Sequence, residues 1–172
     1  TAITTLWPTA WPRSLIASAH VGGELAHKLK FAGWDFVIIE GEAKSPVYLY
    51  IHNEKVEIRD ASAAWGQGTR RSAEVLAKET TPEASFGVIG QAGENLVPMS
   101  NMMVDKSHSA GGLGSVMGKK HLKGIVVYGN QAIHIHADPK EWEELIDSHR
   151  KILGAHTHSI VSRKPHPMFE YH

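Results

Sequence analysis

The spacing of hydrophobic residues changes repeatedly between strand-like and helix-like patterns along the first 130 residues. Short runs rich in β-branched and aromatic residues predict strands. These strands are expected over Thr1–Leu6, Asp35–Glu40, Ser85–Ile89, Pro98–Val104 and Gly124–Tyr128, and Ser14–Ala19 is a further apolar stretch. Val47–Ile51 and Lys55–Arg59 lie on either side of an Asn53-Glu54 turn, so they predict a β-hairpin.

Helical spacing occurs in four other segments. Leu25, Leu29 and Ala32 share one face of a helix over Glu24–Ala32, and Gly33 suits its C-terminal end. The other helices are expected over Thr69–Glu79, over Gly111–Leu122, and from the Asp138-Pro139 start to about Leu153. Gly90–Asn95 predicts a turn, and Met99, Met102 and Met103 are interpreted as core residues. Strands, hairpins and helices do not alternate regularly, so the fold class is predicted to be α+β.

One unit occurs twice in the sequence. Gly22-Gly23, a short helix and a strand ending at Gly41 correspond to Gly111-Gly112, a helix and a strand ending at Gly129, with separations of 41 − 22 = 19 and 129 − 111 = 18 positions. The repeat predicts two halves related by a pseudo-two-fold axis. Adjacent glycines before a helix let a ligand approach the backbone, and the N–H groups of the first turn attract anions. The spacing alone therefore fits two anion sites for a ligand with two phosphate arms, or two tight turns with a packing role only.

Composition narrows the function classes. Eighteen basic residues balance eighteen acidic ones, which argues against a nucleic-acid partner. There is no cysteine, so this sequence offers no iron–sulfur ligand and no thiolate nucleophile, and it fits a cytoplasmic, reducing compartment. No apolar run is long enough for a membrane span, so no membrane partner is expected. No acid–base pair or activated nucleophile is recognisable, so no catalytic residue is assigned.

Four ordered motifs resemble the N-terminal domain of aldehyde:ferredoxin oxidoreductases. They are Gly22–Gly41 (GGELAHKLKFAGWDFVIIEG), Pro46–Arg59 (PVYLYIHNEKVEIR), Ile89–Val97 (IGQAGENLV) and Gly111–Gly129 (GGLGSVMGKKHLKGIVVYG), within a match over roughly residues 1–130. The resemblance implies an α+β domain with a pseudo-two-fold axis that carries a tungsten- or molybdenum-bis-pterin cofactor. It also implies a magnesium ion that bridges the two pterin phosphates.

The resemblance further implies that other domains of the same enzyme complete the active site. Those domains would hold a 4Fe–4S iron–sulfur cluster and pass electrons between an aldehyde-type substrate and ferredoxin or another iron–sulfur carrier. A homodimer is compatible with the family. Residues 1–153 are accordingly predicted to be the cofactor-binding domain, incomplete at its start, and residues 154–172 a linker or the beginning of the next domain.

Site residues are carried over from the family motifs by position. His20, Gly22 and Gly23 match the loop that reaches one phosphate, with His20 also near the magnesium, although the family often has Asn there. The second phosphate loop corresponds to Lys106, Ser109, Ala110, Gly111, Gly112 and Gly114. Lys106 stands near a family arginine, and Ala110 replaces another, which removes a bidentate phosphate donor.

Two other function classes and one other metal site fit parts of the sequence. Met102–Val104 followed by Gly111–Gly118 and a helix could be a nucleotide-binding module, but the connection is long for that turn. A non-catalytic interaction domain is the third possibility. His134 and His136 would share a face if Ala132–His136 were a strand, as a zinc site requires, but no third ligand has a matching spacing.

Overall fold

The computed structural model describes residues 1–8, 15–105, 108–133 and 136–155. Contacts divide the chain into two units, Thr1–Ile133 and His134–His172. The sequence placed a domain boundary at residue 153 instead, and that boundary stays a prediction. Lys106 and His134, two of the residues singled out above, lie outside the described residues.

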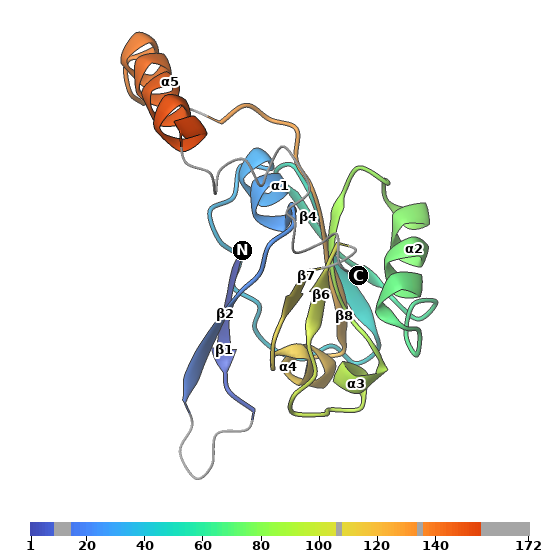
Figure 1. Ribbon diagram of the computed structural model, residues 1–172. Coiled ribbons are helices and arrows are strands. Elements are labelled where there is room, and N and C mark those ends of the chain that lie inside the picture. The colour runs from blue at the N-terminus through green and yellow to red at the C-terminus, as the bar shows by residue number, and fades with distance from the viewer. Residues whose placement is uncertain (9–14, 106–107, 134–135, 156–172) are drawn as a thin grey trace, which may run out of the picture. The chain divides into compact units, whose positions relative to one another are not determined.

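A six-stranded mixed sheet forms the centre of the first unit (Figure 1). Its strand order is β4 (Lys55–Asp60), β3 (Val47–His52), β8 (Leu122–Tyr128), β5 (Ser85–Ile89), β6 (Met102–Val104) and β7 (His108–Ala110). β3 and β8 run parallel, whereas the other neighbouring strands are antiparallel. The β3–β4 hairpin and strand β5 confirm their predictions. The mixed sheet and its helices confirm the predicted α+β class.

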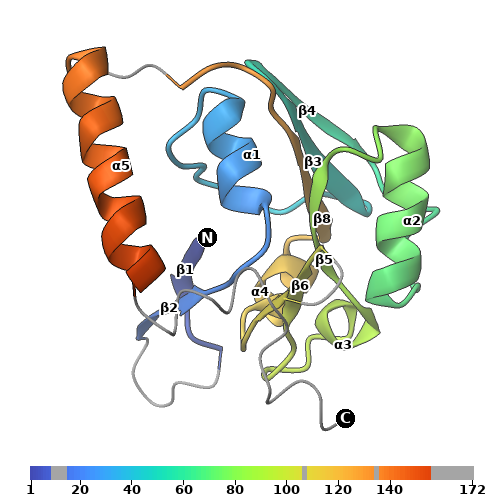
Figure 2. The same ribbon diagram turned by 45° about the horizontal axis from the view of Figure 1, so that its top comes forward.

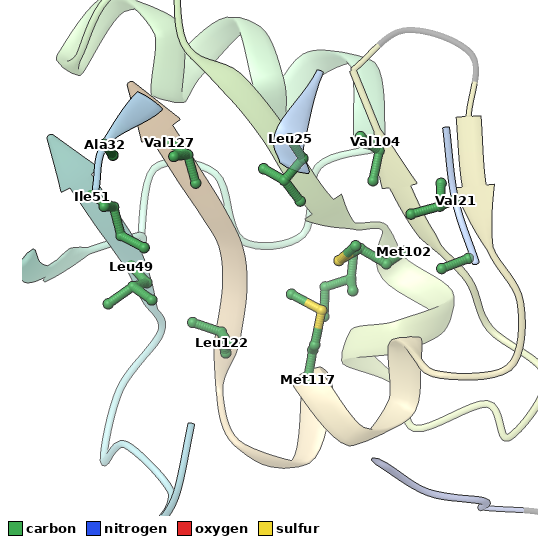
Figure 3. Packing of buried hydrophobic residues seen from close by; sticks show 12 residues of the cluster. Val21, Leu25, Ala32, Leu49, Ile51, Met102, Val104, Met117, Leu122 and Val127 are labelled. Atoms are coloured by element: carbon green, nitrogen blue, oxygen red, sulfur yellow. The ribbon is translucent and has the colours of Figure 1, made fainter. Parts of the chain in front are cut away.

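Helices cover both faces of this sheet (Figure 2). The helices of the first unit are α1 (Leu25–Phe31), α2 (Thr69–Glu79), α3 (Gln91–Glu94) and α4 (Gly114–Lys119). Because strand side chains alternate between faces, Leu49 and Ile51 join the core of α1 and α4, whereas Tyr48 and Tyr50 join the core of α2. Figure 3 shows the first of these cores. Each fully buried aliphatic side chain there stabilises the fold by about 1.5–3 kcal/mol.

The N-terminal segment forms a separate two-stranded sheet. β1 (Ala2–Leu6) pairs antiparallel with β2 (Ile16–His20), which confirms the strand predicted at the start of the chain. The Val21 N–H donates to the Thr1 carbonyl oxygen at 2.8 Å, so pairing continues one residue beyond β2. The hairpin thus ends where the first pair of adjacent glycines begins.

Helix α1 ends as its sequence predicts, at a glycine with a left-handed backbone. Gly33 has a φ of +91°. The end of α1 also packs closely on the end of β8, because a Cβ at Gly129 would lie 2.2 Å from both the Ala32 nitrogen and the Lys28 carbonyl oxygen. Glycine is therefore required at Gly129 by this contact between helix and strand.

The buried strand predicted over Asp35–Glu40 is wrong. The segment has no strand structure, and the side chains of Phe36 and Ile38 are 71% and 74% exposed. Apolar composition predicts burial, but a strand also needs a neighbouring backbone edge. The places beside β3 and β8 are filled, and the segment pairs with neither of the edge strands, β4 and β7. The first copy of the repeat therefore lacks the strand that follows the helix in the second copy.

Three smaller differences concern the segment between β5 and β6. Gly90–Asn95, predicted as a turn, contains the single helical turn α3. The strand predicted over Pro98–Val104 is confined to Met102–Val104, because Pro98 and Met99 lie in a turn. Met99 is 78% exposed, so its assignment to the core is wrong, whereas Met102 is 1% exposed as predicted.

The second unit contains helix α5 (Pro139–Ala155), with the predicted N-cap. Asp138 Oδ1 accepts hydrogen bonds from the Lys140 and Glu141 nitrogens at 2.9 and 3.1 Å. The predicted apolar face includes Trp142 and Leu145, which are partly exposed within this unit. Among the helices described, none has both the length and the apolar character that a membrane span needs.

Candidate functional site: two glycine loops

The first glycine loop consists of His20–Gly23, between the end of β2 and the start of α1. His20 and Gly22 are exposed, Val21 is buried in the core, and Gly23 has a φ of +84°. Within the residues described, no acceptor receives the amide N–H of Gly22 or of Gly23. The loop therefore presents backbone donors without requiring any particular side chain.

The second glycine loop consists of Ser109–Gly114, from the last residues of β7 to the first residue of α4. Gly112 has a φ of +71°, and its N–H donates to Asn101 Oδ1 at 3.0 Å. Gly111 is exposed, and a Cβ there would meet only Asn101 Oδ1, at 3.7 Å. Ala110 is fully buried, so only its backbone could serve a ligand.

Gly114 has a packing role in this second loop. Its N–H donates to the Ser100 carbonyl oxygen at 2.9 Å, and a Cβ there would lie 2.9 Å from the Asn101 carbonyl oxygen. Gly114 was predicted to bind the cofactor, but its close contact with the backbone of residues 100–101 already requires a glycine there. A side chain at Gly114 would push the start of helix α4 away from residues 100–101.

The fold brings the first loop against the connection that leads to the second. A Cβ at Gly22 would lie 2.5 Å from His108 Cδ2, and one at Gly23 would lie 2.6 Å from Asp105 Oδ2. Asp105 follows β6 directly, and His108 begins β7, the strand that leads to Gly111. Residues more than 80 positions apart in the sequence therefore meet, whereas the predicted facing of the two glycine pairs themselves stays a prediction.

Asp105 is a residue of this region that the sequence interpretation missed. Its Oδ1 accepts from Ser85 Oγ at 2.6 Å and from the Phe86 nitrogen at 3.1 Å, and its Oδ2 accepts from the Glu24 nitrogen at 2.8 Å. Glu24 is the N-cap of α1, so a carboxylate of the protein already occupies one N–H that had been expected to serve an anion. From the local sequence alone, Asp105 could equally form an exposed ion pair with the adjacent Lys106.

The lysines that accompany each copy of the repeat lie away from the glycines. Lys28 and Lys119 are in the last turns of α1 and α4, where a positive charge favours the C-terminal end of a helix dipole. Lys28 Nζ lies 5.7 Å from the centre of the Tyr128 ring, and Lys119 Nζ lies 3.3 Å from Glu42 Oε2. These lysines therefore stabilise the helices and do not reach the loops.

A buried ion pair joins β8 to α3, the helix that packs on α4. Lys123 in β8 is 0% exposed and pairs with Glu94 of α3, and its Nζ also donates to the Gln67 carbonyl oxygen at 3.0 Å. Burial lowers the pKa of Lys123, and the nearby Glu94 carboxylate offsets part of that shift. A charged residue inside the apolar run Leu122–Tyr128 was the available signal for this pair.

No metal site of side chains is found in the described residues. There, no three His, Asp or Glu side chains are grouped closely enough to hold a metal ion. The zinc alternative required a strand over Ala132–His136, but Ala132 and Ile133 are not in a strand and His134 lies outside the described part. His20 is exposed at the end of β2, and its proposed role near magnesium stays a prediction.

The strand arrangement also argues against the nucleotide-binding alternative. A dinucleotide site needs a strand of a parallel sheet that leads directly through glycines into a helix. Here Gly111 follows β7, an outer strand that is antiparallel to β6. The glycines therefore do not form that turn.

Comparison with known proteins identifies the family. The family model described as "Aldehyde ferredoxin oxidoreductase, N-terminal domain" matches residues 8–129. Proteins named "Tungsten-containing aldehyde ferredoxin oxidoreductase" are 46% identical over 134 residues in Pyrococcus abyssi and 44% identical over 134 residues in Pyrococcus horikoshii. Both alignments cover 76% of this chain and 22% of the relative, so the chain spans about a fifth of their length.

Two further relatives carry other substrates in their names. A Pyrococcus furiosus protein named "Aliphatic sulfonate oxidoreductase, WOR-like subunit" is 40% identical over 130 residues, covering 67% of this chain and 21% of that protein. A solved structure, "Active site complex BamBC of Benzoyl Coenzyme A reductase in complex with 1,5 Dienoyl-CoA", is 42% identical with a TM-score of 0.76, covering 81% of this chain and 22% of the other. The match over residues 8–129 and these identities show that the chain belongs to the aldehyde ferredoxin oxidoreductase family, with the N-terminal domain of that family as its matched part.

Proposed function

We propose that this domain holds one side of a tungsten–bis-pterin cofactor in a longer oxidoreductase. The contact of the first glycine loop with Asp105 and His108 carries this proposal, because His108 begins the strand that leads to the second loop, and glycine loops before helices suit a ligand with two phosphate arms. The family and the names of its tungsten-containing members support it. Molybdenum is the alternative metal.

The residues present fit such a group. Gly22 and Gly23 offer amide donors for one phosphate, and the exposed Gly111 with Gly112 offers a close approach for the other. The exposed His20 and Ser109 would add side-chain donors nearby, and Lys106 is proposed as a further donor from its place in the sequence alone. A magnesium ion would take its oxygen ligands from the phosphates, from backbone carbonyl groups and from water, because no cluster of acidic side chains is present among the described residues.

The residues of this domain indicate which roles it would fill in the enzyme and which would fall to the cofactor and the other domains. When bound, the cofactor would supply two-electron redox chemistry, and the loops would supply position and hydrogen-bond donors. Remaining domains of the same enzyme would contribute the acid–base groups and the 4Fe–4S cluster, because this chain has no cysteine. We propose an aldehyde-type substrate, ferredoxin or another iron–sulfur protein as electron partner, and a cytoplasmic location. A homodimer is compatible with this arrangement.

Metal and pterin analysis of the full-length protein that carries this domain tests the proposal. We expect tungsten or molybdenum, iron, and about two pterins per chain. Protein purified under strict exclusion of oxygen without such a metal and without pterin would overturn it.

A substitution at Gly111 then tests the loop itself. Gly111→Leu places a side chain where the protein leaves room, so we expect a folded enzyme with less than a tenth of the wild-type pterin content. Gly68→Leu is the matched control, because Gly68 has a negative φ of −65° and a Cβ there would meet nothing within 4 Å. Equal pterin contents in the two variants would contradict a ligand contact at Gly111.

A further inference from the structure

Asp105 connects three parts of the domain through one carboxylate. Oδ1 accepts from two donors of β5, Ser85 Oγ and the Phe86 nitrogen, and Oδ2 accepts from the Glu24 nitrogen of the first glycine loop's helix. The Asp105 N–H donates to the Phe86 carbonyl oxygen at 2.8 Å, which fixes the residue itself on the sheet. Each of these partners of the carboxylate is therefore a donor.

The backbone of Asp105 is held in an uncommon conformation. Its φ is +52°, a left-handed value that Asp and Asn adopt more easily than other residues with a side chain. Asp105 follows the last residue of β6, and the ring of His108, the first residue of β7, lies beside Gly22. Asp105 and His108 thus both lie against the first loop, and β7 leads to the second.

We propose that Asp105 is a positioning residue that fixes the distance between the two glycine loops. The proposal rests on the proposed function, because both loops must hold the same two-armed ligand. The carboxylate joins the start of α1 to β5, and the Asp105 N–H is held by the Phe86 carbonyl oxygen, at the end of β6 that precedes the β7 strand and Gly111. The spacing of the two loops is therefore determined by protein contacts before a ligand arrives, which lowers the ordering cost of binding.

An aspartate suits this position better than its amide. The amide side chain of Asp105→Asn would present only one oxygen, and its NH₂ group would face a donor on the other side. Asp105→Asn must therefore lose the contact either with Glu24 or with β5. Asp105→Gly removes both contacts but keeps the left-handed backbone without strain.

The test uses full-length enzyme with Asp105→Asn, Asp105→Gly, and Asp60→Asn as a matched control. Asp60 is also a hydrogen-bonded carboxylate, but its partners are the Ser62 nitrogen and hydroxyl two residues away. Three quantities are measured: amide hydrogen exchange at Glu24, tungsten and pterin content, and the thermal unfolding midpoint. Exchange and the midpoint are measured on cofactor-free protein.

We expect Asp105→Gly to raise the Glu24 exchange rate by about tenfold or more, as the loss of a hydrogen bond to a charged group predicts. Cofactor content should fall by at least half in Asp105→Gly, by less in Asp105→Asn, and not in Asp60→Asn, with all midpoints within a few degrees. Wild-type cofactor content in both Asp105 variants would overturn the inference. A wild-type enzyme without tungsten and pterin would instead overturn the proposed function, and the exchange at Glu24 would still show whether Asp105 fixes the loop.

Discussion

The two glycine loops share a sequence pattern but differ in how the protein supports them. The first loop is joined to the sheet by the Asp105 carboxylate, and the segment after its helix, Phe36–Ile39, forms no strand. The second loop is connected to the sheet at both ends. It begins in β7, and the helix that follows it, α4, leads directly into β8 in the middle of the sheet. An internal sequence repeat therefore predicts that the two turns are similar, but it does not predict which contacts hold each turn against the sheet.

Two glycines, one after each loop's start, differ in the atoms that pack against them. A Cβ at Gly118, in α4, would lie 1.9 Å from the Gly93 carbonyl oxygen, which belongs to the backbone of α3. A Cβ at Gly22 would instead meet the ring of His108, a side chain on an exposed residue. Helix α4, which follows the second loop, is thus confined by backbone, whereas Gly22 in the first loop is confined by a side chain.

The largest expected effect comes from breaking the ion pair between Lys123 of β8 and Glu94 of α3. Lys123→Met leaves the Glu94 carboxylate 5% exposed without its cation, so we expect a loss of about 3–5 kcal/mol in the free energy of unfolding. Lys123→Met combined with Glu94→Leu should recover most of that loss, because no charge remains buried. Urea unfolding of both proteins measures the difference. A double variant no more stable than the single one would show that the pair has another role.

A smaller effect should distinguish helix α4 from the first loop. Gly118→Ala should cost about 2–3 kcal/mol of unfolding free energy, because backbone must move, whereas Gly22→Ala should cost less than about 1 kcal/mol, because the three nearest atoms to its Cβ belong to the His108 side chain. Thermal and urea unfolding of the two alanine variants measure these costs. Equal costs would mean that the first loop is as confined as helix α4.

The smallest expected effect is a pH dependence of the free energy of unfolding, caused by Lys123. Unfolded chains keep the lysine proton up to the usual pKa of 10.5, but burial lowers the pKa of Lys123 in the folded protein. Between those two pKa values the unfolded state binds more protons, so this residue makes the free energy of unfolding rise with pH. Unfolding measured from about pH 8 up to the usual lysine pKa of 10.5 should therefore show wild type gaining stability relative to Lys123→Met. Parallel pH curves would contradict the lowered pKa.

The sequence predicted those elements whose cause is local. Helix α2, the β3–β4 hairpin and the Asp138 cap of α5 follow from residue spacing and capping chemistry. The strand over Asp35–Glu40 failed, because pairing depends on which backbone edges are free elsewhere in the fold. In the candidate site, Gly22 and Gly111 could be found from the repeat, but Asp105 could not, since its partners Glu24 and Ser85 lie 81 and 20 residues away.

The parallel pairing of β3 with β8 has a consequence for how the domain is made. Strand β8 lies between β3 and β5, so the β3–β4 hairpin and the β5–β6–β7 strands have no pairing with each other until β8 is in place. During synthesis from the N-terminus, both groups of strands leave the ribosome before residues 122–128 do. Loop-closure entropy makes such late, long-range pairing slow. The nascent domain consequently has two unjoined, aggregation-prone strand edges until its central strand emerges, and a chaperone that covers these edges would act during that interval.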